Sequence, residues 1–258
     1  MKQETIRGHI CAPELKNGLP ILTFGVTGST NDEAKRYARE NPEEKRALIT
    51  ADGQTAGRGR LGRSFISGEG AGVYMSLLLI RPELSPKDAP LITAYTATVV
   101  RRAILELTGL ETEIKWVNDI VIRGRKLAGI LTEGALLPSG EYEYCIVGIG
   151  INTRGTRLPS EIADIATTLE MQDATVEREA LIARITELFF ENLNTVGTPT
   201  VAEEYRRHSS VIGKTVTVIK PDCNYTALVT GITDRCELVL EHSGTVEILS
   251  TGEVSVRV

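Results

Sequence analysis

Apolar residues occur along most of the chain in short continuous runs, separated by longer stretches in which they recur every three to four positions. The short runs predict buried strands at residues 21–24, 47–51, 72–80, 120–122, 127–131 and 141–151. The periodic stretches predict helices at residues 30–41, 85–107, 175–193 and 201–208. In the second of these helices, Arg101 and Arg102 are expected to form a solvated face. Residues 1–20 contain glycine and proline without a clear period, and they predict a loop.

The pattern changes near residues 209–213, after which only short strands separated by turn residues follow. These strands predict a small barrel of about 45 residues. We therefore expect a larger domain over residues 1–210 and a small SH3-like β-barrel over residues 211–258. The fold class is α+β, with a mixed central β-sheet, helices packed on one side of it, and the C-terminal barrel.

Hydroxyl and amide side chains stand at the start of the first long helix. Thr30 followed by Glu33 has the spacing of a capping box, in which two side chains satisfy free backbone N–H groups. Ser29 and Asn31, together with Thr30, either only cap the helix or also present free hydroxyl and backbone N–H groups to a ligand. The sequence leaves both interpretations open.

Composition and charge narrow the classes of function. The chain of 258 residues carries 29 basic and 34 acidic side chains, and its net charge of −5 argues against a broad nucleic-acid or membrane surface. No apolar run approaches the roughly 20 residues that cross a bilayer, and the N-terminus lacks the apolar core of a signal peptide. We expect a cytoplasmic protein. The four cysteines and three histidines show no metal-ligand spacing.

Positive charge is concentrated in one loop, residues 57–63, which reads G-R-G-R-L-G-R. Glycine permits close approach of the backbone, and guanidinium groups bind phosphate or carboxylate oxygens in two-pronged geometry. A loop with both properties is suited to wrap an anion. The glycines also fit G-x-G-x-x-G, but no helix follows them and no P-loop motif is present. A Rossmann oxidoreductase and a P-loop ATPase are therefore disfavoured.

Further candidates surround the predicted hairpin. Lys115 and Lys126 lie on either side of it, and Gly148 and Gly150 interrupt the strand that follows. Glycines inside a strand often mark close approach by a ligand or another backbone. The lysines alone would be strand-end residues in water, but beside an arginine loop they become candidates for binding an anion. Trp116 is either a core residue or one wall of a nucleotide site.

Five motifs taken together resemble those of the biotin protein ligase family, over nearly all of the chain. They are S-T-N at 29–31, Q-T-A-G-R-G-R-L-G-R at 54–63, K-W-V-N-D at 115–119, R-K-L-A-G-I-L-T-E at 125–133 and V-G-I-G-I-N at 147–152. The family usually has proline where this chain has Val117, and often tryptophan where it has Phe65; neither difference removes a charge. Because the residues before Ser29 are too few for a helix-turn-helix domain, the resemblance is to the monofunctional type without an N-terminal DNA-binding domain.

The resemblance implies a two-step reaction in a biotin/lipoate ligase-type catalytic domain. Biotin and Mg-ATP give biotinyl-5′-AMP and pyrophosphate, and the biotinyl group then passes to one lysine of a biotin carboxyl carrier protein or domain. The biotin carboxylate is already ionised at neutral pH, so the obstacle is its repulsion from the α-phosphate rather than the lack of a base. Fixed cations would offset that repulsion.

The resemblance also assigns roles to residues. The catalytic cations are Arg60, Lys126 and Lys115. The residues expected to bind biotin are Ser29, Thr30, Asn31, Gln54, Gly57, Arg58, Gly59, Arg60, Lys126, Gly129, Gly148 and Gly150. Those expected to bind ATP are Arg58, Arg60, Arg63, Lys115, Asn118, Lys126 and Asn152, and Asp119 is expected to help hold Mg²⁺.

Two other functions stay open. A lipoate–protein ligase would share the architecture, and a nucleic-acid-binding module would use the arginine loop, although acidity and the lack of interleaved aromatic residues disfavour it. The expected partners are the carrier and, in a homodimer, a second copy of the chain; neither DNA nor a membrane is expected. The loop at residues 153–164 is either a lid over the ligand or a surface connection.

Overall fold

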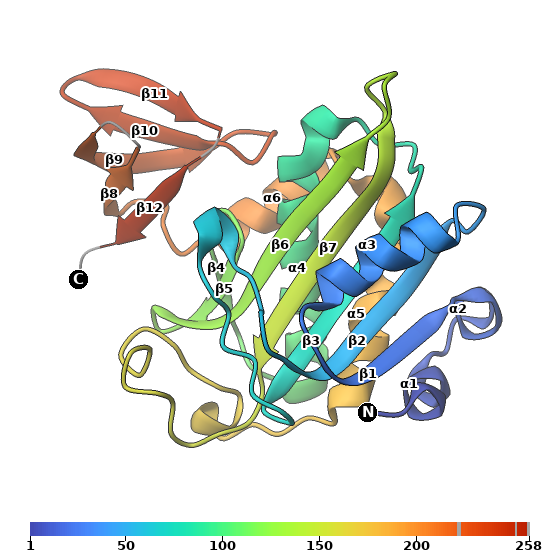
Figure 1. Ribbon diagram of the computed structural model, residues 1–258. Coiled ribbons are helices and arrows are strands. Elements are labelled where there is room, and N and C mark those ends of the chain that lie inside the picture. Colours follow the sequence, from blue (N-terminus) through green and yellow to red (C-terminus); the bar gives the residue numbers. More distant parts are fainter. Residues whose placement is uncertain (221–222, 251, 257–258) are drawn as a thin grey trace.

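A mixed seven-stranded β-sheet forms the centre of the larger part of the protein (Figure 1). The computed structural model describes residues 1–220, 223–250 and 252–256. The sheet consists of β1 (Ile21–Thr27), β2 (Arg46–Gln54), β3 (Gly72–Ile80), β4 (Glu113–Lys115), β5 (Asp119–Ile122), β6 (Arg125–Leu136) and β7 (Tyr142–Asn152). Their order is β1-β2-β3-β7-β6-β5-β4, with β1 and β2 parallel and the other neighbours antiparallel. The predicted mixed sheet is confirmed.

Helices cover both faces of this sheet. They are α1 (Gln3–His9), α2 (Pro13–Gly18), α3 (Thr30–Glu40), α4 (Ala89–Thr108), α5 (Arg178–Glu191) and α6 (Pro199–Arg207). Short 3₁₀ turns cover Arg60–Gly62, Pro86–Asp88, Glu170–Gln172 and Leu193–Thr195. The long helices α4 and α5 pack on one face over the main core, as the sequence predicted, whereas α3 covers part of the opposite face (Figure 1). Because β3 lies between the two layers, all nine of its residues are buried.

The first two helices were not predicted, and the loop expected there is wrong. Each helix is about two turns or less and buries one large apolar side chain, Ile6 in α1 and Leu15 in α2. One anchor per helix produces no periodic signal, so packing rather than sequence pattern determines these helices. The buried Glu187 of α5 also accepts hydrogen bonds from the backbone N–H groups of Cys11 and Ala12, just before α2.

The start of α3 differs from the predicted capping box. Ser29 occupies the N-cap position, and its side chain makes no capping hydrogen bond. The hydroxyl of Thr30 instead donates to Gln54 Oε1 at 3.2 Å, and Glu33 accepts a hydrogen bond from Thr27. The Thr30 hydroxyl therefore bonds to the neighbouring strand β2 rather than capping the helix.

Arg101 and Arg102 of α4 were both predicted to be solvated, and this is wrong for Arg101. Its side chain is 5% exposed and pairs with Glu111 at 2.7 Å and Glu204 at 3.4 Å, which ties α4 to α6. Arg102 is exposed as expected. His208 lies 3.3 Å from Glu204, yet burial and the charge of Arg101 outweigh that carboxylate and lower the pKa of His208.

The C-terminal part is a second, antiparallel sheet of β8 (Thr215–Ile219), β9 (Asn224–Ile232), β10 (Leu238–His242), β11 (Thr245–Leu249) and β12 (Glu253–Val256). Its order is β11-β10-β9-β8-β12. The predicted run of short strands is confirmed, but the pairs among the described residues leave β11 and β12 as open edges, so the expected closed barrel is not formed there. The end of the last predicted strand, residues 257–258, lies outside the described part.

Side chains of the larger part bond to the backbone of the C-terminal sheet. Trp116 is 4% exposed, and its Nε1 donates to the carbonyl of Cys236 at 2.9 Å, so its ring belongs to the packed contact between the two sheets. Arg206 of α6 likewise donates to the carbonyl of Ile232. Within the described residues, no helix combines the length and apolar character that crossing a membrane requires.

Candidate functional site

The site begins where the two parallel strands end. Residues 29–31 follow β1, and Gln54 is the last residue of β2, so the parallel pairing places their side chains at the same edge of the sheet. The backbone N–H of Thr30 donates to Gln54 Oε1 at 2.8 Å, and Gln54 Nε2 donates to Ser67 Oγ at 3.0 Å. Ser76 Oγ of β3 lies 2.8 Å from Thr30 Oγ1 and 2.6 Å from Asn31 Oδ1, and its single hydroxyl hydrogen is donated to one of these two oxygens. The result is a fixed polar wall that extends from the helix start to the central strands.

Glycines of two adjacent strands leave room above the sheet on the α3 face. Gly129 of β6 pairs with Gly150 of β7, and Gly148 lies two residues before Gly150. A Cβ atom at position 148 would lie 2.4 Å from Asn31 Oδ1, and one at position 150 would lie 2.6 Å from the Phe65 ring. Larger residues would therefore displace both neighbours, which explains why these two positions of a buried strand are glycine.

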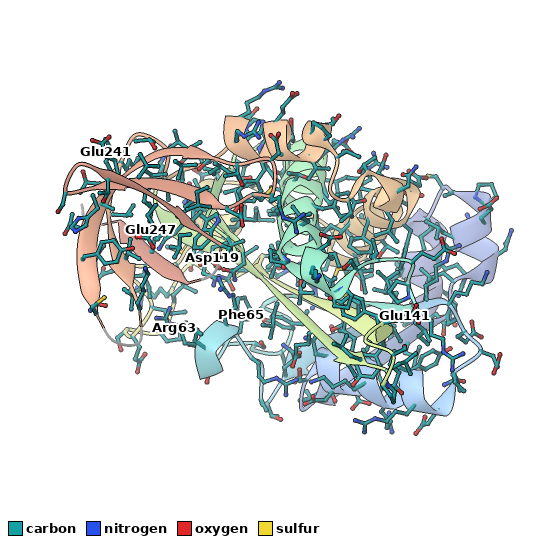
Figure 2. The ribbon with its side chains drawn as sticks, turned by 90° about the horizontal axis from the view of Figure 1, so that it is seen from above. Arg63, Phe65, Asp119, Glu141, Glu241 and Glu247 are labelled. Atoms are coloured by element: carbon teal, nitrogen blue, oxygen red, sulfur yellow. The ribbon has the colours of Figure 1, made fainter. Side chains whose placement is uncertain are left out.

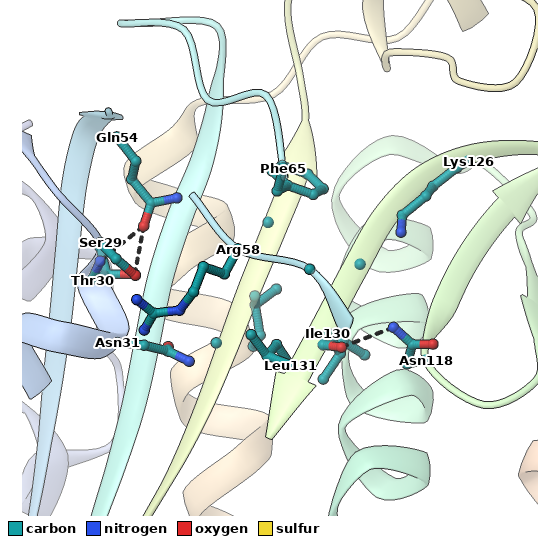
Figure 3. Close-up of a pocket in the computed structure, with 15 residues that line it drawn as sticks. Ser29, Thr30, Asn31, Gln54, Arg58, Phe65, Asn118, Lys126, Ile130 and Leu131 are labelled. Atoms are coloured by element: carbon teal, nitrogen blue, oxygen red, sulfur yellow. Dashed lines mark hydrogen bonds between the residues drawn. The ribbon is translucent and has the colours of Figure 1, made fainter. Parts of the chain in front are cut away.

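A pocket of about 460 Å³, part of it open to solvent, lies over these glycines (Figure 3). Its lining residues come from the start of α3, the end of β2, the arginine loop and Phe65 after it, Asn118 before β5, and strands β6 and β7. They are Ser29, Thr30, Asn31, Gln54, Arg58, Gly59, Phe65, Asn118, Lys126, Gly129, Ile130, Leu131, Gly148, Ile149 and Gly150. All residues expected to bind biotin line this pocket except Gly57 and Arg60. Gly57 lies directly behind it, since a Cβ there would be 3.1 Å from Gln54 Nε2.

The apolar lining was not predicted. Phe65 lies over Gly150, with its ring centroid 6.4 Å from that of Tyr74 in an edge-to-face contact. Its place just after the arginine loop was the one sequence signal for a role in the site. Ile130, Leu131 and Ile149 gave no such signal, because they belong to ordinary apolar strands in which alternation cannot distinguish a pocket from a core.

Lys126 and Asp119 form an ion pair at one end of the pocket. Lys126 Nζ lies 2.7 Å from Asp119 Oδ1, and 6.0 Å from the centroid of the Phe65 ring. The pair lacks hydrogen-bond geometry, and Asp119 Oδ1 is buried without a hydrogen-bond partner among the described residues. The backbone of Lys126 bonds to Ile165 and Thr167, so the segment after β7 is fixed beside this end.

Arg58 occupies the other end and faces two carboxylates. Its Nη1 and Nη2 lie 2.6 and 2.7 Å from the two oxygens of Asp32, and Nη2 lies 3.3 Å from Glu133 Oε2. The hydrogen bond from Arg58 lowers the pKa of Asp32 and raises that of Arg58. Burial of Glu133 would raise its pKa, but hydrogen bonds from Lys35 and Asn31 outweigh that effect and lower it. Arg58, Asp32 and Glu133 are therefore charged at neutral pH.

Arg60 lies outside this pocket and bridges the two parts of the protein. Its Nη1 donates to Asn118 Oδ1 and its Nη2 to the carbonyl of Gly252, both at 3.2 Å. It lines a second cavity, shared with Leu131 of the pocket and Ser250 of the C-terminal sheet. Asn118 is held in turn by a 2.9 Å hydrogen bond from its Nδ2 to the carbonyl of Ile130.

Besides Arg60, three residues expected to bind ATP do not line the pocket. Arg63 follows the 3₁₀ turn of the arginine loop, on the side of the C-terminal sheet (Figure 2). Lys115 ends β4, directly opposite Asp119 in the strand register. Asn152 donates to the carbonyl of Thr167 at 3.2 Å and so supports the segment after β7. Their roles stay predictions.

The described side chains near Asp119 do not form a site for a resident magnesium ion. In the part of the chain that the structure describes, no cluster of three or more carboxylate, histidine or cysteine side chains could hold a metal. Asp119 is a single carboxylate already paired with Lys126. Since Mg²⁺ is commonly bound through one or two carboxylates together with substrate phosphates, these residues do not fit a metal held by the protein alone.

Fold and site together define a class: a mixed-sheet domain whose pocket has a glycine floor, a polar wall and a border of arginine and lysine. The family follows from comparison with known sequences. Residues 23–152 match the model of the biotin/lipoate A/B protein ligase family, and residues 211–257 match that of the biotin protein ligase C-terminal domain. The chain belongs to the biotin/lipoate A/B protein ligase family.

Individual relatives agree with this assignment. The chain is 32% identical to the bifunctional ligase/repressor BirA of Bacillus subtilis, over 96% of this chain and 79% of that protein. It is 28% identical to the biotin–[acetyl-CoA-carboxylase] ligase of Mycobacterium tuberculosis, over 88% of this chain and 85% of the relative. Its fold resembles that of the biotin protein ligase from Aquifex aeolicus, solved in complex with biotin and ATP. The TM-score is 0.77 at 26% identity, covering 92% of this chain and 98% of that one.

Proposed function

We propose that this protein is an ATP-dependent biotin–protein ligase. It forms biotinyl-5′-AMP from biotin and Mg-ATP and then transfers biotin to a lysine of a biotin carboxyl carrier protein or domain. The names of its relatives support the substrate and the kind of carrier. The observation that carries the proposal is the arrangement of the pocket, which has neutral hydrogen-bonding groups at one end, an apolar middle and an ammonium group at the other.

This arrangement suits the two ends of biotin. The ureido group of the ring system needs neutral donors and acceptors, which Ser29, Thr30 and Gln54 supply. Leaving such a group unpaired in the pocket would cost about 1–3 kcal/mol. The apolar tail would lie along Leu131 and Phe65, and the carboxylate would then reach Lys126.

The first step requires positioning and charge more than proton transfer. A carboxylate oxygen of biotin attacks the α-phosphorus of ATP, the bond from that phosphorus to the bridging oxygen breaks, and pyrophosphate leaves with the electron pair. Lys126 offsets the repulsion between the two anions, and Arg60 stabilises the phosphate oxygens from the opposite side. Mg²⁺ arrives with ATP as part of the substrate.

The second step transfers the acyl group. The neutral amine of a carrier lysine attacks the biotinyl carbonyl carbon, an amide bond forms, and AMP leaves as the mixed anhydride bond breaks. The proton that the amine loses passes to solvent or to the departing phosphate. Because AMP leaves as a stabilised anion, the same cations assist this step.

Lipoate is the alternative substrate, because the family includes lipoate ligases. Two observations favour biotin. The wall at the Thr30 end offers hydroxyl and amide groups, with which a ureido group can form hydrogen bonds and an apolar dithiolane ring cannot. Residues 211–257 also match the C-terminal domain of biotin protein ligases. A homodimer and a cytoplasmic location stay predictions, to be checked by light scattering and by fractionation of the source cells.

Isotope exchange between pyrophosphate and ATP tests the proposal. With Mg-ATP, the purified protein should catalyse exchange that depends on biotin and not on lipoate, and it should label a carrier domain on lysine. Arg60→Ala and Lys126→Ala should each lower exchange by about 10²-fold or more. Arg36→Ala, which removes an exposed arginine of α3 paired with Glu33, is the matched control. Exchange with lipoate alone would assign the alternative, and exchange with neither would reject both.

A further inference from the structure

Four charged side chains of alternating sign meet at the mouth of the pocket, away from Lys126. Lys35 pairs with Glu133 at 2.8 Å, Glu133 with Arg58 at 3.3 Å, and Arg58 with both oxygens of Asp32. Asn31, a lining residue, also donates to Glu133 at 2.6 Å. Two positive and two negative charges cancel within this cluster, so it adds no net charge to the pocket.

The direction of Arg58 separates it from the cations expected to bind phosphate. Its side chain leaves the arginine loop and crosses the pocket toward Asn31 and the start of α3, whereas Lys126 points into the pocket from the opposite side (Figure 3). Both terminal nitrogens already contact carboxylate oxygens. A guanidinium held in this way binds a phosphate only by giving up a bidentate pair, which is among the stronger side-chain contacts that arginine makes.

Asp32, Glu133 and Arg58 come from three different segments around the pocket. Asp32 is in the first turn of α3, next to the lining residues 29–31, and Glu133 is on β6, the strand that carries Lys126 and Gly129. Arg58 comes from the loop between Gly57 and Phe65, whose two ends are joined by a 2.9 Å backbone hydrogen bond. The contacts of Arg58 with α3 and β6 therefore hold one side of this loop over the pocket, while Arg60 anchors its other side to Asn118.

We infer that Asp32 and Glu133 are positioning residues which, through Arg58, latch the arginine loop over the bound acid substrate. This inference rests on the proposed function and gives Arg58 a different part in it: closing the pocket rather than binding phosphate. The latch acts on substrate retention. The chemical step, which belongs to the cations at the far end, does not depend on it.

Removing the charges of the latch separates binding from chemistry. Asp32→Asn and Glu133→Gln should each raise the KM and the dissociation rate of biotin by about fivefold, the size expected of a partly exposed ion pair, while kcat for exchange stays within about twofold of wild type. Because both acids act through Arg58, the double variant Asp32→Asn/Arg58→Gln should be no weaker than Arg58→Gln alone. Glu33→Gln removes another acid from the first turn of α3, one that pairs with Arg36, and should leave the KM unchanged.

Titration calorimetry gives the biotin affinity of each full-length variant, and the exchange assay gives its kcat and KM. Melting temperatures show whether each variant is folded. If Arg58→Gln lowers kcat and leaves the biotin KM unchanged, the latch inference is overturned. Arg58 would then act on the phosphate of ATP, as the sequence predicted. Additive losses in the double variant, or an Asp32→Asn variant that retains biotin as well as wild type, would also overturn the inference. If the wild-type protein binds biotin but catalyses no exchange, the proposed function fails while the affinity series still tests the latch.

Discussion

Replacing Lys126 with methionine tests the electrostatic account of the site most directly, because it removes the ammonium group and keeps most of the apolar stem. The variant also leaves Asp119 at the end of the pocket without the partner that lies 2.7 Å away in the native protein. The change therefore deletes a positive charge and exposes a negative one, both beside the position proposed for the substrate carboxylate.

The magnitude follows from these two charges. Two anions about 4 Å apart repel by about 4 kcal/mol at an effective dielectric constant near 20, and a cation between them cancels much of that. Loss of Lys126 should thus slow adenylation by about 10²–10³-fold, as for other fixed donors at a transition state. Asp119 Oδ1 lies 2.7 Å from Lys126 Nζ, so an anion bound by that ammonium lies within about 5.5 Å of it. The uncompensated Asp119 carboxylate therefore adds about 3 kcal/mol before screening by salt. The double variant Lys126→Met/Asp119→Asn should therefore recover about tenfold over Lys126→Met.

The expected order of activity is wild type, then Lys126→Met/Asp119→Asn, then Lys126→Met. Biotin-dependent pyrophosphate exchange at saturating Mg-ATP measures it, and thermal melting shows whether each variant is folded. The reasoning is refuted if Lys126→Met retains wild-type turnover, since the ammonium group would then have no part in the reaction. It is also refuted if the double variant is slower than the single one. In that case Asp119 contributes a function of its own, such as the contact with Mg²⁺ predicted from the sequence.

Three further predictions concern the pocket, pH and the contact between the sheets. Gly148→Ala places a methyl group 2.4 Å from Asn31 Oδ1 and should raise the biotin KM by about tenfold or more in steady-state assays, through displacement of that side chain. Burial lowers the pKa of His208 in the folded protein, so this side chain binds a proton more readily in the unfolded chain. The melting temperature should therefore fall as the pH drops through the ordinary value of 6.5, and this fall should be smaller in His208→Gln. Trp116→Phe leaves the buried carbonyl of Cys236 unpaired and should lower unfolding free energy by about 1–3 kcal/mol in urea titrations.

Much of the fold could be predicted because its strands carry strong local signals. β3 is an apolar run broken only by Ser76. The turn between β5 and β6 contains Arg123 and Gly124, both at positive φ, as a tight hairpin requires. Helices α1 and α2 could not be predicted, since one buried side chain in each makes no pattern. Arg101 was misjudged because its ion pair with Glu204 depends on α6, which is about a hundred residues away in the chain.

The candidate site was predicted in part, for a physical reason. Motifs locate residues along the chain, and the parallel pairing of β1 and β2 then brings them together, as with Thr30 and Gln54. Motifs do not give the direction of a side chain. Asn152 lies on the glycine-bearing strand, yet its amide bonds to Thr167. Phe65 and Leu131 line the pocket because residues from other segments of the chain form its opposite wall. The local sequence around Phe65 and Leu131 cannot show this.

The strand directions also leave one end of the molecule remote from the pocket. β6 runs from Lys126 at the site to Leu136, and the chain then turns through Gly140, where a side chain would meet no atom within 4 Å. That turn is accordingly the natural place to splice an epitope or a fluorescent peptide for immobilising the enzyme. A chimera made there should keep its substrate constants, whereas the same graft in the loop after Gly57 would abolish them.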